Sequence, residues 1–282
     1  MSTVLEDVAR AICDELNLDF IGGSGEGTFK ETYHVINQHG FNIALKVFKS
    51  GKISERTKRE IDAMLVCNHP NIGKLIQVTK YEYKGQNYLY LLEEFLLGGT
   101  LTEKLKLRTM NISEFYLIGN SLIDALSHIS SHGLVHRDIK PDNIMFREDG
   151  LTPVIVDFGL VRDLNSESLT QTWLMQGPGS PYFSSPEQLN NQKELIDWRS
   201  DQFSLGITFS LSLLGMHPYG FIGDDPGDVV NRIIRRSNFS TEFEHFCREC
   251  KLDVLFKMVS PWPIGRYRTP KQLKDAWNLY KV

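Results

Sequence analysis

Hydrophobic residues recur every three or four positions at the start of the chain. Val8, Ile12 and Leu16 share one side of a helical repeat, and Glu6 lies in its first turn, where the helix dipole favours an acidic group. This pattern predicts an amphipathic helix over residues 3–16, ahead of the main body of the chain.

The runs that follow predict strands and longer helices. Residues 75–83 and 88–95 are strand-like, and the short polar segment between them indicates a hairpin. Residues 113–133 place apolar side chains on one face of a long helix, which we expect Ser113 to cap. The segment 200–214 is apolar on all sides, which is typical of a helix buried in the centre of a domain.

Composition limits the classes of protein that fit this pattern. The chain has 282 residues, of which 41% are hydrophobic, and this is enough for a packed core in two lobes or one large domain. A net charge of −4 provides no overall basic field for nucleic acid or for an anionic membrane surface. The apolar run 203–216 is too short to span a bilayer. We therefore expect neither a nucleic-acid partner nor a membrane partner.

The four cysteines are too few and too irregularly spaced to suggest a disulfide framework. They favour a reducing compartment, and hence a cytoplasmic protein. Cys247 and Cys250 lie next to His245 at a spacing found in zinc and redox sites. Because no second pair of ligands lies nearby in the sequence, we interpret them as free thiols one helical turn apart.

The segment between His136 and Gly159, HRDIKPDNIMFREDGLTPVIVDFG, contains most of the candidate chemistry. Asp138 and Asn143 are five residues apart, and Asp157 follows a short run rich in valine and isoleucine. Two carboxylates and one amide provide oxygen ligands, which Mg²⁺ prefers in combination with substrate phosphates. We therefore expect these three side chains to converge beside one metal and phosphate site.

The joint pattern H-R-D-x-K-x-x-N followed by D-F-G resembles the eukaryotic-like, or Hanks-type, serine/threonine protein kinases. The resemblance implies an α+β, bilobal protein-kinase fold that binds ATP and Mg²⁺. It implies that Asp138 accepts or orients the proton of the substrate hydroxyl and that Lys140 neutralises the transferred phosphoryl group. Asn143 and Asp157 would hold Mg²⁺, and Lys140 favours serine and threonine over tyrosine as acceptors.

The resemblance covers the chain from about residue 20 to its end and implies three parts. Residues 1–19 would be a helical extension, residues 20–97 a β-rich N-lobe with its C helix, and residues 98–282 a larger helical C-lobe. We see no repeats, added sensor domain or membrane anchor, so we expect a stand-alone catalytic domain similar to the bacterial branch of the family.

A glycine cluster and the segment I-A-L-K match two further kinase motifs. Glycines let the backbone approach a triphosphate, although such a cluster by itself is equally typical of a flexible turn. By resemblance, Gly25 and Gly27 are the first two glycines of the phosphate loop, and Lys46 is the ATP-binding lysine. Lys30 replaces the family's third glycine and Thr32 replaces its valine, which are departures at the nucleotide site.

Residues 54–67 resemble the C helix of the family, and we expect Glu60 to form an ion pair with Lys46. Glu55 is a competing candidate at a poorer spacing. Glu93 falls at the gatekeeper position, where a carboxylate is unusual. It could compete with Glu60 for Lys46 or point into a polar pocket, and both alternatives remain open at this stage.

A pair of glycines at 98 and 99 resembles the family's hinge. Counting back from it, the backbones of Glu94 and Leu96 are expected to form hydrogen bonds with adenine. Ala44 would lie on one side of the adenine ring and Met145 on the other. Apart from the neighbouring motifs, both of these residues would be interpreted as core.

The stretch between D-F-G and the closing motif S-P-E has the length and polarity of an activation segment. Thr170 and Thr172 form a T-x-T pair, and a phosphate on either one could be bound by Arg137. The alternative is an ordinary loop rich in serine and threonine. Ser180 replaces the family's threonine and keeps the hydroxyl expected to bond the catalytic Asp and Lys.

Three residues are expected to hold the catalytic loop and the closing motif in place. Asp201 matches the family's anchor for the catalytic-loop backbone, although a carboxylate near a helix start could equally be a cap. Arg266 matches the arginine that pairs with the carboxylate of the closing motif, here Glu187, and Arg268 is the alternative partner.

The function implied by the resemblance is a serine/threonine protein kinase with protein substrates, which self-associates to phosphorylate its own activation segment. A pseudokinase scaffold is one alternative, suggested by Lys30, Thr32 and Glu93. The other is a small-molecule phosphotransferase, a class that shares the Asp and Asn constellation but lacks the activation segment with its closing P-E and partner arginine.

Overall fold

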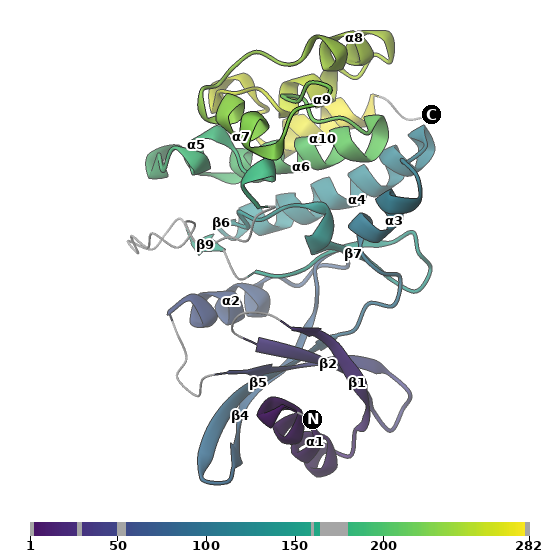
Figure 1. The fold of residues 1–282 in the computed structure, drawn as a ribbon, viewed down its shortest axis with the longest axis vertical. Helices are drawn as coiled ribbons and strands as arrows, with labels where there is room; N and C mark the ends of the chain where they lie inside the picture. Colours follow the sequence, from purple (N-terminus) through teal and green to yellow (C-terminus); the bar gives the residue numbers. More distant parts are fainter. Residues whose placement is uncertain (1–2, 27–29, 50–54, 159–160, 164–179, 280–282) are drawn as a thin grey trace. The chain divides into compact units, whose positions relative to one another are not determined.

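The computed structural model describes residues 3–26, 30–49, 55–158, 161–163 and 180–279. The chain divides into two compact units, one made of Met1–Asn68 with Gly73–Leu97 and the other of His69–Ile72 with Gly98–Val282. Figure 1 labels the elements of both units.

The first unit is built on a five-stranded antiparallel sheet with the strand order β1-β2-β3-β5-β4. Among the residues described for this unit, two helices accompany the sheet, one before β1 and one between β3 and β4. The elements are α1 (Val4–Leu16), β1 (Asp19–Glu26), β2 (Lys30–Ile36), β3 (Asn42–Phe48), α2 (Glu55–Val66), β4 (Leu75–Tyr83) and β5 (Gln86–Glu94).

The two helices of this unit cover opposite faces of the sheet, because side chains alternate between the faces along each strand. Helix α1 buries Val8 and Ile12 among odd-numbered residues of β2 and β3 such as Leu45. On the other face, Ile61 of α2 packs with Phe48 and residues of β5. Figure 1 shows α1 and α2 on the two sides of the sheet.

The predicted N-terminal helix is therefore part of the first unit's core. Thr3 caps α1 by accepting a hydrogen bond from the N–H of Glu6. The hydroxyls of Thr3 and Tyr33 both donate to Glu31 of β2, at 2.9 and 2.6 Å. These contacts tie the start of α1 to the sheet.

The second unit is mostly helical. Its strands are short and pair in two small ladders, β6 with β9 and β7 with β8. Its α-helices and strands are α3 (Leu101–Leu107), α4 (Ile112–Ser131), β6 (Leu134–Val135), β7 (Ile144–Phe146), β8 (Pro153–Ile155), β9 (Arg162–Asp163), α5 (Pro186–Leu189), α6 (Trp198–Leu214), α7 (Pro226–Ile234), α8 (Thr241–Glu249), α9 (Asp253–Met258) and α10 (Pro270–Asn278). Short 3₁₀ turns lie at Pro141–Asn143, Ser180–Phe183, Lys193–Leu195 and Pro263–Gly265.

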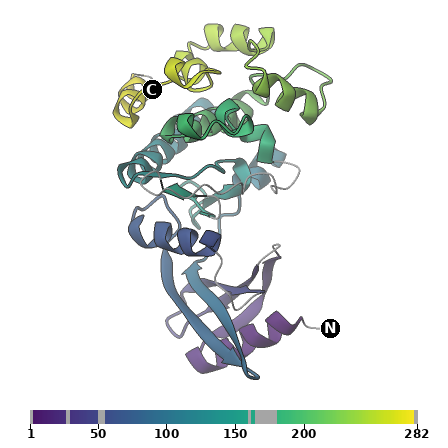
Figure 2. The same cartoon turned by 90° about the vertical axis from the view of Figure 1, so that its left-hand side faces the viewer.

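Helices α4 and α6 form the centre of this unit and lie side by side in Figures 1 and 2. As predicted, α6 is buried along almost its whole length. Helix α10 packs closely on α4, where a Cβ atom at Gly119 would lie 2.1 Å from the indole of Trp277. The absence of a side chain at Gly119 therefore permits this approach.

The cap predicted for α4 is wrong. Asn111, not Ser113, is the N-cap and forms a capping box with Glu114. Glu114 also binds Arg108 with two hydrogen bonds of 2.7 and 2.6 Å, so this carboxylate strongly favours the Asn111 cap. Across the part of the chain that the structure describes, no helix is long and apolar enough to cross a lipid bilayer.

Candidate active site

A buried carboxylate anchors the loop that follows β6. Asp201, near the start of α6, accepts hydrogen bonds from the backbone N–H groups of His136 and Arg137, both at 2.7 Å. The N-cap of α6 is Asp197, so Asp201 anchors the loop and does not cap the helix. Burial raises the pKa of Asp201 to about 7, in opposition to the two N–H groups, which favour the charged form.

The backbone is strained at two non-glycine residues of the site, one in this loop and one after β8. Arg137 has φ of 71° and Asp157 has φ of 65°, in the left-handed region that side chains disfavour. Strained residues persist where the surrounding structure holds them, and they cluster at functional sites. The anchor at Asp201 provides such restraint for Arg137.

His136 links the loop to the strand that precedes Asp157. Its Nδ1 accepts from the N–H of Asp138 at 3.3 Å, so its Nε2 carries the hydrogen and donates to the carbonyl of Val156 at 3.2 Å. Burial lowers the pKa of His136, which keeps the imidazole neutral and preserves this hydrogen-bond pattern.

Asp138 lies at the centre of a cluster with Lys140 and Asn143. Its Oδ2 accepts from Nζ of Lys140 and from Nδ2 of Asn143, both at 2.9 Å. Asn143 also donates to the backbone carbonyl of Asp138 at 2.9 Å. These bonds orient the Asp138 carboxylate and place one ammonium group directly beside it.

The donor set fits a hard divalent cation. The Nδ2 of Asn143 makes both side-chain hydrogen bonds, which orients its Oδ1 as an available oxygen ligand. Asp157 is exposed and follows Val156, whose N–H donates to the carbonyl of Asn143 at 3.0 Å. The backbone thus brings an amide oxygen and a carboxylate, both typical Mg²⁺ ligands, into one part of the second unit.

In the first unit, Lys46 has a different partner from the one we expected. Its Nζ forms an ion pair with Oε2 of Glu93 at 2.5 Å. Glu60 instead pairs with Lys30, the residue that replaces the third glycine of the phosphate loop. The expected ion pair between Lys46 and Glu60 is corrected accordingly, and of the two alternatives for Glu93 the structure has the pairing with Lys46.

The residues expected to bind adenine lie on several elements. Ala44 is buried on β3, opposite Glu93 of β5. Glu94 ends β5 and its N–H donates to the carbonyl of Lys74 at 3.0 Å, while Leu96 is buried just beyond the strand. Met145 is half-buried on β7 of the second unit.

The glycine cluster is part of β1, which extends to Glu26 and pairs with β2 through two register shifts. Gly25 pairs with Thr32, and a Cβ atom at Gly25 would meet no other atom within 4 Å. Gly27 lies outside the described residues. Open space at Gly25 leaves its backbone accessible on that side.

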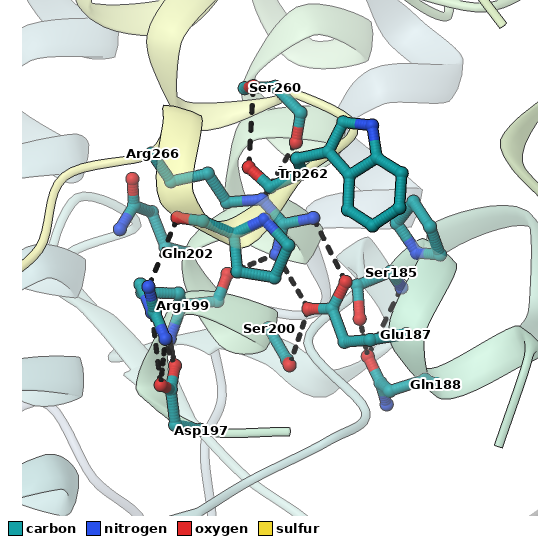
Figure 3. Close-up of polar contacts among 12 residues, drawn as sticks. Ser185, Glu187, Gln188, Asp197, Arg199, Ser200, Gln202, Ser260, Trp262 and Arg266 are labelled. Atoms are coloured by element: carbon teal, nitrogen blue, oxygen red, sulfur yellow. Dashed lines mark hydrogen bonds and ion pairs between the residues drawn. The ribbon is translucent and has the colours of Figure 1, made fainter. Parts of the chain in front are cut away.

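The closing motif is locked by a buried ion pair (Figure 3). Arg266, and not Arg268, donates to both carboxylate oxygens of Glu187, at 2.6 and 3.0 Å, and both side chains are fully buried. Burial would raise the pKa of Glu187, but Arg266 and the hydroxyl of Ser200 outweigh that effect and lower it. The carboxylate is therefore ionised in the folded protein at neutral pH.

Sequence reasoning missed Gln188, which connects the closing motif to the catalytic loop. Its Nε2 donates to the carbonyl of Arg137 at 2.9 Å, and its Oε1 accepts from the N–H and hydroxyl of Ser185. The spacing S-x-x-Q is a capping box, and this signal was available in the sequence.

Three expected residues of the activation segment have no described side chain. Thr170 and Thr172 lie outside the described residues. The backbone of Ser180 starts a 3₁₀ turn, but its side chain is not described.

Cys247 is buried and Cys250 is exposed, and both are free thiols.

Residues 20–277 match the protein kinase domain family, so the chain belongs to that family. Members of this family generally use ATP and Mg²⁺. The expected family and its α+β fold are therefore confirmed.

Three relatives illustrate the range of similar proteins. CBL-interacting serine/threonine-protein kinase 26 of Arabidopsis thaliana is 28% identical over 90% of this chain and 56% of its own length. A probable serine/threonine-protein kinase of Clostridium perfringens is 28% identical over 82% of this chain and 33% of its own. Calcium-dependent protein kinase 5 of Plasmodium berghei is 31% identical over 74% of this chain and 36% of its own length. The chain thus spans about half or less of the length of these relatives.

Proposed function

We propose that the chain is an ATP- and Mg²⁺-dependent protein kinase that transfers the γ-phosphoryl group of ATP to serine or threonine hydroxyls of proteins. The observation that carries the proposal is the cluster in which Lys140 and Asn143 orient Asp138, on a loop anchored by Asp201. A carboxylate held in this way has one oxygen, Oδ2, bonded by an ammonium and an amide donor, and this fixes the orientation that a proton acceptor requires.

Each residue of the cluster has a defined task in this proposal. Asp138 orients the substrate hydroxyl and accepts its proton, and Lys140 stabilises the negative charge on the transferred phosphoryl group. Asn143 and Asp157 would hold Mg²⁺, which when bound offsets phosphate charge. Lys46 would bind phosphate oxygens of ATP. Catalysis then depends on positioning and electrostatics, because phosphoryl transfer needs little covalent chemistry from the protein.

The adenine contacts are proposed from the family pattern. The backbones of Glu94 and Leu96 would recognise the adenine edge, with Ala44 and Met145 on its two faces, and Gly25 and Gly27 would approach the phosphates. A cytoplasmic location is supported by four free cysteines, three of them buried.

A protein acceptor is favoured over a small-molecule acceptor by the buried pair of Glu187 with Arg266. This pair secures the closing end of the activation segment, and small-molecule phosphotransferases lack both partners. The matches cover only 56% and 33% of the length of two relatives. The protein substrates and partners of this chain are therefore also part of the proposal.

A thermal-shift titration with ATP and Mg²⁺, followed by measurement of phosphate incorporation into a generic protein substrate, tests the proposal. Stabilisation by the nucleotide together with incorporation on serine or threonine is expected. Stabilisation without incorporation would instead indicate a nucleotide-binding scaffold, and incorporation into a small molecule but not protein would indicate a small-molecule phosphotransferase.

A further inference from the structure

Four charged side chains gather on one face of the sheet in the first unit. Lys30 lies on β2, Lys46 on β3 and Glu93 on β5, while Glu60 reaches the group from α2. All four side chains are at most one-fifth exposed, so solvent screens their charges only weakly. The choice of partners within this group therefore matters energetically.

Strand register explains why Lys46 meets Glu93. Ala44 is paired with Glu93 across β3 and β5, and Lys46 lies two residues from Ala44 on the same face. Lys46 and Glu93 are thus diagonal neighbours, a separation that long side chains bridge. Their relation is set by the hydrogen-bonded ladder and does not depend on the position of α2.

Glu60 is held by a second cation on the same face. Lys30 is paired with Phe48, two residues beyond Lys46, and its ammonium group bonds Oε1 of Glu60. A transfer of Lys46 from Glu93 to Glu60 would leave Glu93 buried without its cation and would require Glu60 to exchange Lys30 for Lys46. Because an unpaired buried carboxylate is strongly destabilising, Glu93 favours the observed pairing of Lys46.

Glu93 depends on Lys46 for an additional reason. Its residue is 7% exposed, and its other oxygen, Oε1, is buried with no hydrogen-bond partner. Loss of the lysine charge would leave both oxygens buried without a donor, at the full cost of desolvation. The pair should therefore show strong mutual dependence.

We propose that Glu93, and not Glu60, is the positioning residue that holds Lys46 for phosphate binding. This inference rests on the proposed function for the role of Lys46, and the pairing itself can be tested without activity. In this arrangement Glu93 of the neighbouring strand β5 holds Lys46. Glu60 pairs instead with Lys30, at the end of the phosphate loop.

A stability cycle tests the pairing directly. Urea midpoints would be measured for Lys46→Met, Glu93→Gln and Glu60→Gln and for the doubles that combine Lys46→Met with each Glu variant. The double with Glu93→Gln is expected to be clearly more stable than the sum of its singles, whereas the double with Glu60→Gln should deviate from additivity much less. Coupling of Lys46 to Glu60, with additivity for Glu93, would overturn the inference.

A kinetic comparison tests the positioning role. Glu93→Gln is expected to lower kcat/KM for ATP roughly ten- to hundred-fold, mainly through KM for ATP, with KM for the protein substrate little changed. Glu60→Gln should lose several-fold less, and Glu82→Gln, an exposed carboxylate on β4, serves as the matched control. A larger loss for Glu60→Gln than for Glu93→Gln, or a parallel rise of both KM values, would contradict the proposal.

The two arms distinguish the inference from the proposed function. If the wild-type protein transfers no phosphate, the proposed function fails, but the stability cycle still reports which carboxylate holds Lys46. If the wild type is active and the cycle couples Lys46 to Glu60, only the positioning inference fails.

Discussion

Arg266 and Glu187, 79 residues apart in the chain, form a doubly hydrogen-bonded ion pair with no exposed side-chain surface. Arg266 also donates to the backbone carbonyls of Ser260, Arg199 and Pro261, at 2.8, 3.0 and 3.4 Å. The pair therefore joins the closing motif, the start of α6 and the segment before α10 (Figure 3).

Removing one member of this pair should strongly destabilise the second unit. Arg266→Met leaves the Glu187 carboxylate buried without a cation, and we expect a loss of about 3–5 kcal/mol in the free energy of unfolding. Urea denaturation measures this loss. Lys271→Met, which removes an exposed pair with Asp275 on α10, is the matched control and should cost less than about 0.5 kcal/mol. Equal effects of the two variants would show that the buried pair does not brace the fold.

The same carboxylate predicts a pH dependence. The pKa of Glu187 is lowered below its ordinary value of 4.5, so its contribution to stability is complete above that pH and is lost as the pH falls through the lowered folded-state pKa. The stability difference between the wild type and Glu187→Gln should therefore be largest near neutral pH and shrink below pH 4.5. Urea midpoints at a series of pH values would reveal it; a difference that grows on acidification would contradict the assigned ionisation.

Gln188 is expected to act through the catalytic loop. Glu at this position still accepts from Ser185 but, while ionised, cannot donate to the carbonyl of Arg137. We expect Gln188→Glu to lower kcat roughly tenfold at pH 8, because a small misplacement of the loop costs activity. Burial raises the pKa of such a carboxyl group, so a proton should restore the donor at lower pH.

The measurement is the ratio of kcat for the variant to that for the wild type between pH 6 and pH 8. The ratio should rise toward one as the pH falls. Gln77→Glu, an exposed residue of β4, is the control and should give a constant ratio. A low ratio at every pH would mean that the substitution disrupts packing and not a single hydrogen bond.

Thr170 and Thr172 are the predicted sites of control. A phosphate on either threonine carries nearly two negative charges, which the guanidinium of Arg137 can bind. Dephosphorylated Thr170→Ala/Thr172→Ala protein should stay several-fold less active than the wild type after both are incubated with ATP. Self-labelling of the wild type should rise faster than linearly with protein concentration if it occurs in trans. Equal activity of the two proteins would leave the T-x-T pair without a regulatory role.

Much of the fold follows from local patterns. The apolar repeat of α1 and the strand-like runs of β4 and β5 lie within a few residues of their predicted limits. The cap of α4 was placed wrongly because Ser113 and Asn111 are both good caps, and Arg108 adds a tertiary preference for the box at Asn111 that spacing alone does not contain.

In the candidate site, one arrangement follows from neighbouring residues in the sequence and another depends on residues far apart in the chain. Lys140 and Asn143 both bond Asp138 within six residues of chain, so their motif predicts their arrangement. The partner of Lys46 depends on the register of β3 with β5 and on the side chain at position 30, which lies on a third strand. Such a choice between two carboxylates requires the three-dimensional structure.

In the proposed reaction, Asp138 orients the protein hydroxyl that receives the phosphoryl group and accepts its proton. Transfer of labelled phosphate from ATP to a protein substrate, measured for the wild type, Asp138→Asn and Asp142→Asn, tests it most directly. Asp142 is an exposed carboxylate of the same loop, so its variant makes the identical chemical change outside the cluster. We predict that Asp142→Asn remains as active as the wild type and that Asp138→Asn loses about 10²–10⁴-fold. Equal activity of all three proteins, or no transfer by the wild type, would contradict the account.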